Sequence, residues 1–566
     1  MEHVNQIISK REKENIMKKL KKLFAVMLSL IMVLAMGITS FAATPGDDGK
    51  YGTADDRGTI TVKGVESTAT VMAYKVIEAQ YGNNGGSFSG YNSLYPSVIA
   101  NDRLQADLDI TSDDLNKLAD AVNADTTKTA ISMAYANGSW TATVKPGTYL
   151  VLVTNAETNI YNPMVVSVYY TNEDGTTNDL HEGELKIEEG GATAKVSGQP
   201  KVDKVITSGN GTDKGNSANV GDTVSYKVSV NPVPNYNGTN PKLNVVDTLD
   251  KGLQYTDESL NVVVKGANTD GTDKALVAGT DYTFTPSTKG GKTVLTVDFV
   301  VGDKYTLNAY AGKVVEITYN ATLTSDATLN DNANVNDVTL NYTRDSKTNG
   351  NDGSDNDKTY TYTFDIDGAA TGTTGIINKK GDKATDTEGL NDATFALYKA
   401  EQLKEDGSFK GDPYKTTTSE TQGDKKGQLH FTGLAAGTYY LQETAAPNGY
   451  SVNTTIFKVV IEASYYQKGE TLPKDKEVGM LKSWTVKVGE GINATGDALK
   501  EVANFTVNNE GTMTRAENGG MNIQNTSISS LPSTGGIGTT IFTIVGCGIM
   551  IAAAGLFFAS RRKENR

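Results

Sequence analysis

The chain is poor in the side chains that crosslink or activate many proteins. It has one cysteine, Cys547, and three histidines among its 566 residues. A single cysteine excludes a disulfide within the chain, so any added stability must come from elsewhere. Two histidines, His181 and His430, lie beyond the N-terminal leader described below, and neither has a cysteine or another histidine nearby in the sequence. Zinc sites and histidine-based nucleophilic catalysis are therefore poorly supported, and we predict no enzyme activity, cofactor or metal.

Two acidic features stay open at this stage. Residues 46–49 (GDDG), together with Asp55 and Asp56, could surround a cation. The EF-hand spacing is missing, however, and solvated acidic loops are commoner. Paired carboxylates of the glycosidase type also stay open, although no segment points to them.

Positive charge is scarce over most of the chain and is concentrated at its two ends. The formal net charge is −14, but residues 1–42 carry seven Lys/Arg against three Asp/Glu, and residues 535–566 carry four against one. Without these ends the net charge falls to −21. Such a surface repels nucleic acids and anionic membranes, so we exclude both as partners.

The N-terminal end has the pattern of a secretory signal. A lysine-rich stretch at 18–22 precedes an apolar run at 23–38, and small residues follow at Ser40 and Ala42. This order is typical of a signal peptide, which we place at 1–42 with cleavage after Ala42. Translation starting at Met17 is an alternative, because residues 1–16 have no place in such a signal.

The C-terminal end has three parts in fixed order. A pentapeptide comes first: Leu531, Pro532, Ser533, Thr534 and Gly535. An uncharged, mostly apolar run at 537–559 follows, and then a basic tail ending at Arg566. About 20 helical residues span a bilayer, so the run is predicted to be a transmembrane helix with the basic tail in the cytoplasm.

This arrangement resembles the LPxTG sorting signal that sortase transpeptidases recognise. The resemblance implies cleavage between Thr534 and Gly535 and transfer of the Thr534 acyl group to an amine. The protein would then be secreted and covalently anchored to peptidoglycan. A plain single-span membrane anchor is the alternative, which the position of the motif disfavours.

Between the two ends, short alternating runs separated by turn residues predict an all-β chain. Examples are 59–62 (TITV), 223–230 (TVSYKVSV) and 314–319 (VVEITY). Period-two alternation with regular turns is typical of Ig-like β-sandwiches. Helical signal is sparse, and 113–122 with Ser112 as its cap is the best example.

The organisation that we predict has six parts. They are a signal region at 1–42, an N-terminal domain at 43–198, a second sandwich at 199–343, a linker at 344–358, a third sandwich at 359–526, and a sorting region at 527–566.

The third sandwich contains residues 439–450 (YYLQETAAPNGY), which match the E-box of Gram-positive pilins in a collagen-adhesin B-type domain. In domains of this family, a lysine of the first strand bonds covalently to an asparagine of the last, and the E-box glutamate promotes the reaction. The resemblance assigns these roles to Lys379, Asn525 and Glu443. Lys380 is the alternative lysine.

The second sandwich resembles the A-type pilin domain. It opens with residues 200–206 (PKVDKVI), in which alternation directs Lys204 into the core. The resemblance implies an isopeptide bond from Lys204 to Asn336, promoted by Asp247. Asn334 and Asn341 are close competitors for the asparagine.

Burial explains how such residues could react. A buried ammonium loses solvation and its pKa falls, whereas the pKa of a buried carboxyl rises. The neutral amine can then attack the asparagine Cγ while the acid polarises the amide oxygen, and ammonia leaves. Fixed side chains can reach effective molarities on the order of 10⁵ M or more. A buried lysine–carboxylate ion pair beside a hydrogen-bonded asparagine is the simpler alternative for each set.

Taken together, these resemblances imply the major subunit of a sortase-assembled pilus. Its expected partners are a class C pilin sortase, a housekeeping sortase, other copies of itself and peptidoglycan, with minor tip or basal pilins and host or matrix ligands left open. The family joins subunits through a lysine in a Tyr-Pro-Lys motif, which this sequence lacks. Lys201 of Gln199-Pro200-Lys201 is our choice, and Lys195 is next. A monomeric wall-anchored adhesin with a crosslinked stalk is the alternative function.

Overall fold

The computed structural model describes fifteen stretches of the chain. They are residues 43–45, 50–82, 87–104, 110–173, 175–176, 180, 185–236, 241–344, 352–366, 375–383, 385, 389–422, 425–516, 520–528 and 537–564. The predicted signal peptide and the LPSTG pentapeptide lie outside these residues, as do His181 and residues 46–49 of the acidic loop. The C-terminal helix α3 (Ile537–Glu564) is described.

Within the described residues, no helix has both the length and the apolar character that crossing a bilayer requires. The transmembrane segment therefore stays a prediction.

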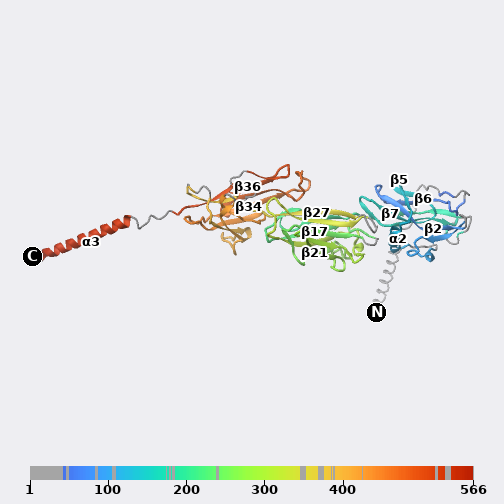
Figure 1. Cartoon of the computed structure of the whole chain (residues 1–566), viewed down its shortest axis with the longest axis horizontal. Coiled ribbons are helices and arrows are strands. Elements are labelled where there is room, and N and C mark those ends of the chain that lie inside the picture. The colour runs from blue at the N-terminus through green and yellow to red at the C-terminus, as the bar shows by residue number, and fades with distance from the viewer. Residues whose placement is uncertain are drawn as a thin grey trace, which may run out of the picture. The chain divides into compact units, whose positions relative to one another are not determined.

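The chain divides into two compact units. The first contains residues 1–208, 221–326 and 334–360, and the second contains residues 209–220, 327–333 and 361–566. Strands predominate in both (Figure 1). The all-β prediction is therefore confirmed.

Two sheets and one helix form the N-terminal part of the first unit. One sheet has the order β11-β1-β6-β5 and the other the order β10-β9-β7-β2-β3, with β4 also pairing with β2. The strands are β1 (Gly58–Lys63), β2 (Thr70–Tyr81), β3 (Phe88–Ser93), β4 (Ala130–Ser132), β5 (Ala134–Ala136), β6 (Ser139–Val144), β7 (Gly147–Thr154), β9 (Met164–Thr171), β10 (Lys186–Glu189) and β11 (Gly191–Thr193). A separate pair joins β8 (Asn159–Tyr161) to β12 (Val196–Gly198).

Strand β7 is buried on both faces, which explains its nearly continuous apolar sequence. Tyr149 and Val151 pack in the core between the two sheets. Leu150 and Leu152 pack in a second cluster that includes Leu118 of helix α2 (Ser112–Ala124). The helix therefore covers the outer face of this sheet.

The cap of α2 differs from the prediction. Thr111, not Ser112, is the N-cap, because its hydroxyl accepts a hydrogen bond from the Asp114 N–H at 3.2 Å. The Asp114 carboxylate in turn accepts from the Thr111 N–H at 3.1 Å. This reciprocal capping box begins the helix one residue earlier than predicted.

The rest of the first unit is a β-sandwich around one core. One sheet has the order β13-β16-β25-β19-β20 with β18 beside β25, and the facing sheet contains β27-β26-β17-β22-β21. The strands are β13 (Lys201–Ile206), β16 (Thr223–Asn231), β17 (Leu243–Leu249), β18 (Leu253–Tyr255), β19 (Asn261–Val264), β20 (Lys274–Ala275), β21 (Thr283–Lys289), β22 (Lys292–Asp298), β25 (Val315–Leu323), β26 (Asn334–Thr343) and β27 (Asp352–Tyr362). A separate pair joins β23 (Val300–Val301) to β24 (Lys304–Tyr305). Alternate residues of β16, β25 and β26 are buried, as period-two patterning requires.

The position of strand β27 corrects our prediction that residues 344–358 are a linker. Residues 352–358 are part of this strand despite their polar sequence. The Asp355 carboxylate accepts a hydrogen bond from the Val202 N–H at 2.9 Å, and Asp357 accepts from the Lys204 N–H at 2.6 Å. The acidic residues thus satisfy backbone donors of β13, a strand at the end of its sheet, rather than forming a solvated spacer.

The second unit contains two further sheets. One has the order β31-β32-β28-β38 and the other the order β30-β29-β33-β34-β35-β36-β37. The strands are β28 (Ile377–Gly381), β29 (Thr394–Lys399), β30 (Lys415–Thr418), β31 (Glu420–Gln422), β32 (Lys425–Gln428), β33 (Gly437–Ala445), β34 (Ile456–Tyr465), β35 (Leu481–Glu490), β36 (Lys500–Val507), β37 (Met513–Ala516) and β38 (Met521–Asn525). Outside these two sheets, β14 (Asn210–Gly211) pairs with β15 (Gly215–Ser217). Strands β28 and β38 run parallel, with Lys379 opposite Ile523.

Candidate functional site

The second unit brings Lys379, Glu443 and Asn525 together in its interior. Lys379 lies on β28, Asn525 on the neighbouring strand β38, and Glu443 on β33 of the other sheet. The Lys379 side chain is 0% exposed, and the other two residues are buried. The three residues chosen from the E-box resemblance therefore form one buried cluster, which we call the third-domain cluster.

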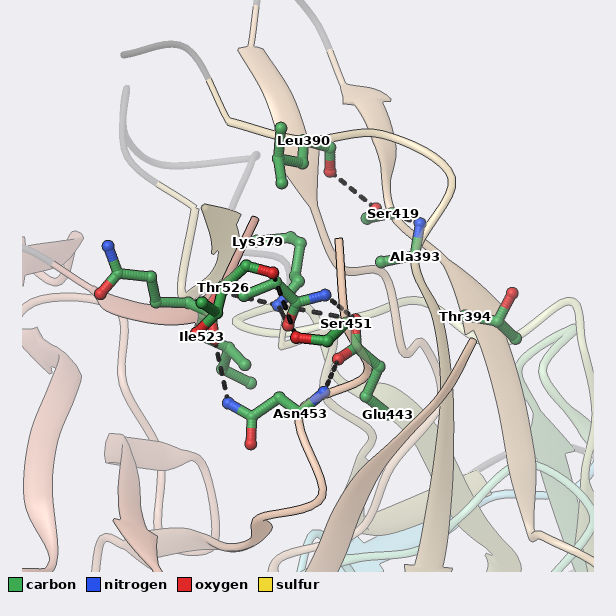
Figure 2. A network of polar contacts seen from close by, with 12 residues as sticks. Lys379, Leu390, Ala393, Thr394, Ser419, Glu443, Ser451, Asn453, Ile523 and Thr526 are labelled. Carbon is green, nitrogen blue, oxygen red and sulfur yellow. Dashed lines mark hydrogen bonds and ion pairs between the residues drawn. The ribbon is translucent and has the colours of Figure 1, made fainter. Parts of the chain in front are cut away.

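The contacts in this cluster place the amine beside the amide. Lys379 Nζ donates to Asn525 Oδ1 and to the Ile523 carbonyl, the latter at 3.1 Å. Glu443 Oε1 lies 3.5 Å from Lys379 Nζ and accepts from Asn525 Nδ2 at 2.9 Å. The other carboxylate oxygen accepts from the Asn453 N–H at 2.6 Å (Figure 2).

This arrangement changes one step of the expected mechanism. We expected the acid to polarise the amide oxygen. Glu443 instead contacts the amide nitrogen, because the ammonium of Lys379 already donates to the oxygen. The carboxylate is therefore placed to pass a proton to the leaving nitrogen.

The turn after the E-box holds the end of β38. Gly449 has φ +85°, a conformation that L side chains rarely adopt, and its carbonyl accepts from the Ile528 N–H at 2.8 Å. Ser451 N–H donates to the Thr526 carbonyl at 3.0 Å, and Asn453 Nδ2 donates to the Gln524 carbonyl at 3.1 Å. These bonds hold the strand end that carries Asn525.

Burial lowers the pKa of Lys379 to about 8, although the nearby Glu443 carboxylate acts in the opposite direction. About a tenth of this amine is therefore neutral at pH 7, far more than for an exposed lysine. The alternative, Lys380, is half-buried and is the next residue along β28, so its side chain points to the other face of the sheet.

The first unit brings together Lys204, Asp247 and Asn336. Lys204 lies on β13 of one sheet, and the other two residues lie on β17 and β26, which are neighbours in the facing sheet. Lys204 is 0% exposed, and both partners are buried. A Lys204–Asn336 bond would therefore join the two sheets, whereas a Lys379–Asn525 bond would join neighbouring strands of one sheet.

Tyr319 contacts these three residues, and we call the four together the second-domain cluster. Lys204 Nζ lies 2.5 Å from Asp247 Oδ2 and 2.8 Å from the Tyr319 hydroxyl. The same hydroxyl donates to Asp247 Oδ2 at 2.6 Å. Asn336 satisfies its neighbours when its nitrogen donates to Asp247 Oδ1 at 2.6 Å and its oxygen accepts from Lys204 Nζ at 3.2 Å, with the Tyr319 hydroxyl 2.7 Å from that oxygen. The opposite amide orientation would set two acceptor oxygens against each other.

Desolvation dominates the electrostatics here as well. Burial lowers the pKa of Lys204, and the Asp247 charge opposes that effect. Burial raises the pKa of Tyr319 well above its ordinary value, and Asp247 reinforces this shift. The tyrosine therefore remains a hydroxyl donor at physiological pH.

The competing asparagines lie elsewhere on β26. Asn334 is buried on the same face as Asn336, two residues away. Asn341 is on the opposite face, and its Nδ2 donates to Asn244 Oδ1 at 2.9 Å. Of the three, the structure places Asn336 against Asp247 and Lys204.

Other predicted residues have plainer surroundings. Lys201 is 67% exposed and pairs with Asp355 at 3.3 Å, and Lys195 is exposed. Asp56 is buried and accepts hydrogen bonds from the Gly52 N–H at 2.6 Å and the Tyr170 hydroxyl at 2.7 Å, so it fastens a turn. His430 is half-buried.

Sequence reasoning missed Tyr319 and Asn453. Alternation in 314–319 does place Tyr319 on the buried face with Val315 and Ile317. The alternation does not indicate, however, that the Tyr319 hydroxyl contacts a lysine from another strand. Asn453 follows the E-box, but it acts mainly through its backbone N–H, which leaves no signature in the sequence.

Three family models match separate parts of the chain. A T6 antigen Ig-like domain matches residues 55–193, a prealbumin-like fold domain matches residues 374–471, and an LPXTG cell wall anchor motif matches residues 523–566. The anchor match confirms the prediction of an LPXTG wall anchor. Cleavage between Thr534 and Gly535 stays a prediction.

Two relatives cover most of the chain. The trypsin-resistant surface T6 protein of Streptococcus pyogenes serotype M6 is 25% identical over 572 residues, covering 95% of this chain and 99% of that protein. The solved structure of the T6 backbone pilin of serotype M6 S. pyogenes, described as modular and three-domain, has a TM-score of 0.51 at 20% identity, with 84% of this chain and 99% of that one covered. The structural likeness shows the fold. The anchor motif, the prealbumin-like domain and the end-to-end match to a T6 protein make this chain a relative of the sortase-assembled major pilins of Gram-positive bacteria.

Proposed function

We propose that this protein is the shaft-forming subunit of a wall-anchored pilus and that it crosslinks itself through Lys204–Asn336 and Lys379–Asn525 amide bonds. The observation that carries the proposal is the pair of buried clusters, each with a fully buried lysine against a carboxylate and an asparagine. A buried ion pair alone is weak support for stability, since desolvation offsets the attraction. The asparagine within reach of each amine supplies a chemical reason for the arrangement.

The reaction needs only groups of the chain itself. In the third-domain cluster, Lys379 gives a proton to Glu443, and the neutral amine attacks Cγ of Asn525. Glu443 returns that proton to Nδ2, the Cγ–Nδ2 bond breaks, and ammonia leaves. The new amide nitrogen releases its extra proton to the carboxylate, so atoms and charges balance. Fixed neighbours make such an attack effectively unimolecular.

The proposed crosslinks would supply the covalent stabilisation that disulfides give other secreted proteins. Each closes a loop of well over a hundred residues, and by the loop-entropy model each stabilises the fold by about 5 kcal/mol. An amide is also inert to reductants. A shaft outside the cell therefore gains stability and resistance to pulling without cysteine.

Lys201 is our proposed acceptor for polymerisation. A sortase would join its Nζ to the Thr534 acyl group of another copy. Support comes from its exposure on β13, where Lys204, on the other face, is buried. Lys195 is also exposed and is the second choice.

The test is a reaction of the purified chain with a class C pilin sortase. We expect a ladder of SDS-resistant multimers that Lys201→Ala abolishes and Lys195→Ala leaves intact. The reverse pattern would move the acceptor to Lys195. A single wall-linked band from cells, with no ladder in either assay, would contradict the shaft and favour a monomeric adhesin.

A further inference from the structure

We propose that the Tyr319 hydroxyl is a catalytic group of the second-domain cluster, which donates a hydrogen bond to the Asn336 amide oxygen as Lys204 attacks. The inference rests on the proposed function, because it assigns a role within the same crosslinking reaction. It adds a group that the carboxylate mechanism does not use.

The position of Tyr319 carries the argument. Strand β25 buries alternate residues, and Tyr319 is 3% exposed with its ring stacked on that of Tyr226 at 5.3 Å between centroids. Its hydroxyl lies within hydrogen-bond distance of all three reacting groups: Lys204 Nζ, Asp247 Oδ2 and the Asn336 amide. Packing alone requires only the ring, and a buried hydroxyl is costly unless it is bonded.

The hydroxyl has one proton and two acceptors that compete for it. While Asp247 is ionised, its Oδ2 is the stronger acceptor and takes the bond at 2.6 Å. When Lys204 passes a proton to Asp247, the neutral carboxyl becomes a weaker acceptor for the Tyr319 hydroxyl. The Tyr319 proton can then turn to Asn336 Oδ1, 2.7 Å away.

The reacting step follows from this switch. The neutral Lys204 amine attacks Cγ, and negative charge develops on Oδ1 while Tyr319 donates to it. Asp247 takes the Lys204 proton on Oδ2, and rotation of its carboxyl brings this proton to Nδ2, which lies 2.6 Å from Oδ1 before the reaction. The Cγ–Nδ2 bond breaks, ammonia leaves, and Asp247 accepts the remaining proton from the new amide. A fixed donor aimed at a developing oxyanion is among the strongest catalytic devices.

The third-domain cluster is built differently. There the amine itself donates to the asparagine oxygen, and a phenylalanine, Phe395, has its ring 5.8 Å from Lys379 Nζ. A hydroxyl at this point is therefore not a general need of the chemistry. Loss of the Tyr319 hydroxyl should slow the second-domain reaction rather than abolish it.

The experiment follows ammonia loss in newly synthesised full-length chain. Cell-free synthesis with timed mass spectrometry of the 204–336 and 379–525 peptides reports each reaction separately. We expect Tyr319→Phe to slow the second-domain reaction by about 10²-fold. The third-domain reaction in the same sample should keep its wild-type rate.

Tyr342→Phe is the matched control. Tyr342 is buried on β26, the strand of Asn336, and its hydroxyl donates to Gln199 Oε1 at 2.9 Å, outside the reacting cluster. This variant should react at the wild-type rate. Equal slowing of both variants, or a wild-type rate in Tyr319→Phe, would overturn the inference.

A second measurement guards against misfolding of Tyr319→Phe. A fluorinated tyrosine placed at position 319 keeps the ring and hydroxyl but is a stronger donor, so it should speed the second-domain reaction. An unchanged rate would overturn the role of Tyr319. If the wild-type chain itself formed no 204–336 crosslink, the proposed function would fail instead, so the two failures are distinct.

Discussion

At the residue scale, the proposed function depends on two fully buried lysines. Lys204 and Lys379 are both 0% exposed, and each touches a carboxylate and an asparagine. In the proposed reaction, desolvation supplies the neutral amine and the carboxylate moves the protons. The chemistry therefore follows from where these side chains are placed rather than from unusual residue types.

Replacing Glu443 by glutamine tests the proton carrier. Glutamine keeps the shape of the side chain but cannot accept a proton from Lys379. Since general acid–base groups contribute about 10²–10⁴-fold, the third-domain reaction should slow by that factor. Freshly purified Glu443→Gln chain should then have lost one ammonia in intact-mass measurements, not two.

Glu462→Gln is the control for this variant. Glu462 lies in the same unit on β34, is 55% exposed and pairs with Lys487 at 2.7 Å. Its loss should leave both crosslinks intact. Loss of two ammonia molecules from Glu443→Gln at the normal rate would remove Glu443 from the mechanism.

The buried amine also predicts a pH dependence of stability. In Asn525→Ala the crosslink cannot form and Lys379 stays free. Its pKa is about 8 in the fold against 10.5 when unfolded, so between these values the unfolded chain binds the extra proton. Stability should therefore rise as pH increases from about 8 to 10.5, by up to about 3 kcal/mol.

Chemical denaturation of Asn525→Ala and of Lys379→Met/Asn525→Ala across this pH range checks the effect. The double variant lacks the titrating amine, and every other group is shared. The difference between the two slopes isolates Lys379. Parallel pH profiles would show that the fold does not depress the pKa of this lysine.

At the element scale, the two proposed crosslinks would bridge different pairs of strands. Lys379 and Asn525 lie on the parallel neighbours β28 and β38, whereas Lys204 and Asn336 lie on strands of facing sheets. A bond between β28 and β38 carries tension from the start of the third domain directly to its end. The hydrogen bonds of the intervening strands are then spared from unzipping.

Single-molecule pulling tests whether force passes directly from β28 to β38, because it measures how much chain is released on unfolding. Lys379→Met removes the crosslink and frees the 146-residue separation between Lys379 and Asn525 to extend. At about 3.4 Å per residue, the variant should release roughly 500 Å of contour length that the wild-type chain withholds. Equal release by both chains would mean that no covalent bond joins β28 to β38.

The elements also show how far the sequence can be read. Alternation was sufficient to send Lys204 inward and Lys201 outward on β13. The E-box was sufficient to choose Glu443, because its motif is tied to one strand and one turn. Tyr319 could not be chosen, since nothing local tells which buried hydroxyl will face a lysine from another strand.

Residues 352–358 show the opposite failure. Their Asp/Asn/Gly composition is typical of a linker, yet they form a strand beside β26, and two of their carboxylates bind backbone donors of β13. Local composition cannot reveal such a long-range partner. In contrast, the wall-anchor motif was readable without any structure, since its parts are adjacent in sequence.

At the whole-molecule scale, the proposal places covalent bonds at two levels. Bonds within the subunit would stabilise each sandwich, and bonds between Thr534 and a surface lysine would extend the shaft. The absence of disulfides, the acidic surface and the anchor motif are all consistent with a load-bearing protein outside the cell. Every level of this account depends on the two internal amides.

Mass spectrometry of the secreted chain, residues 43–534, tests that dependence most directly. The account predicts an intact mass two ammonia molecules below the encoded value, with digestion yielding one branched peptide that joins Lys204 to Asn336 and another that joins Lys379 to Asn525. The encoded mass, with all four side chains recovered unmodified, would contradict it.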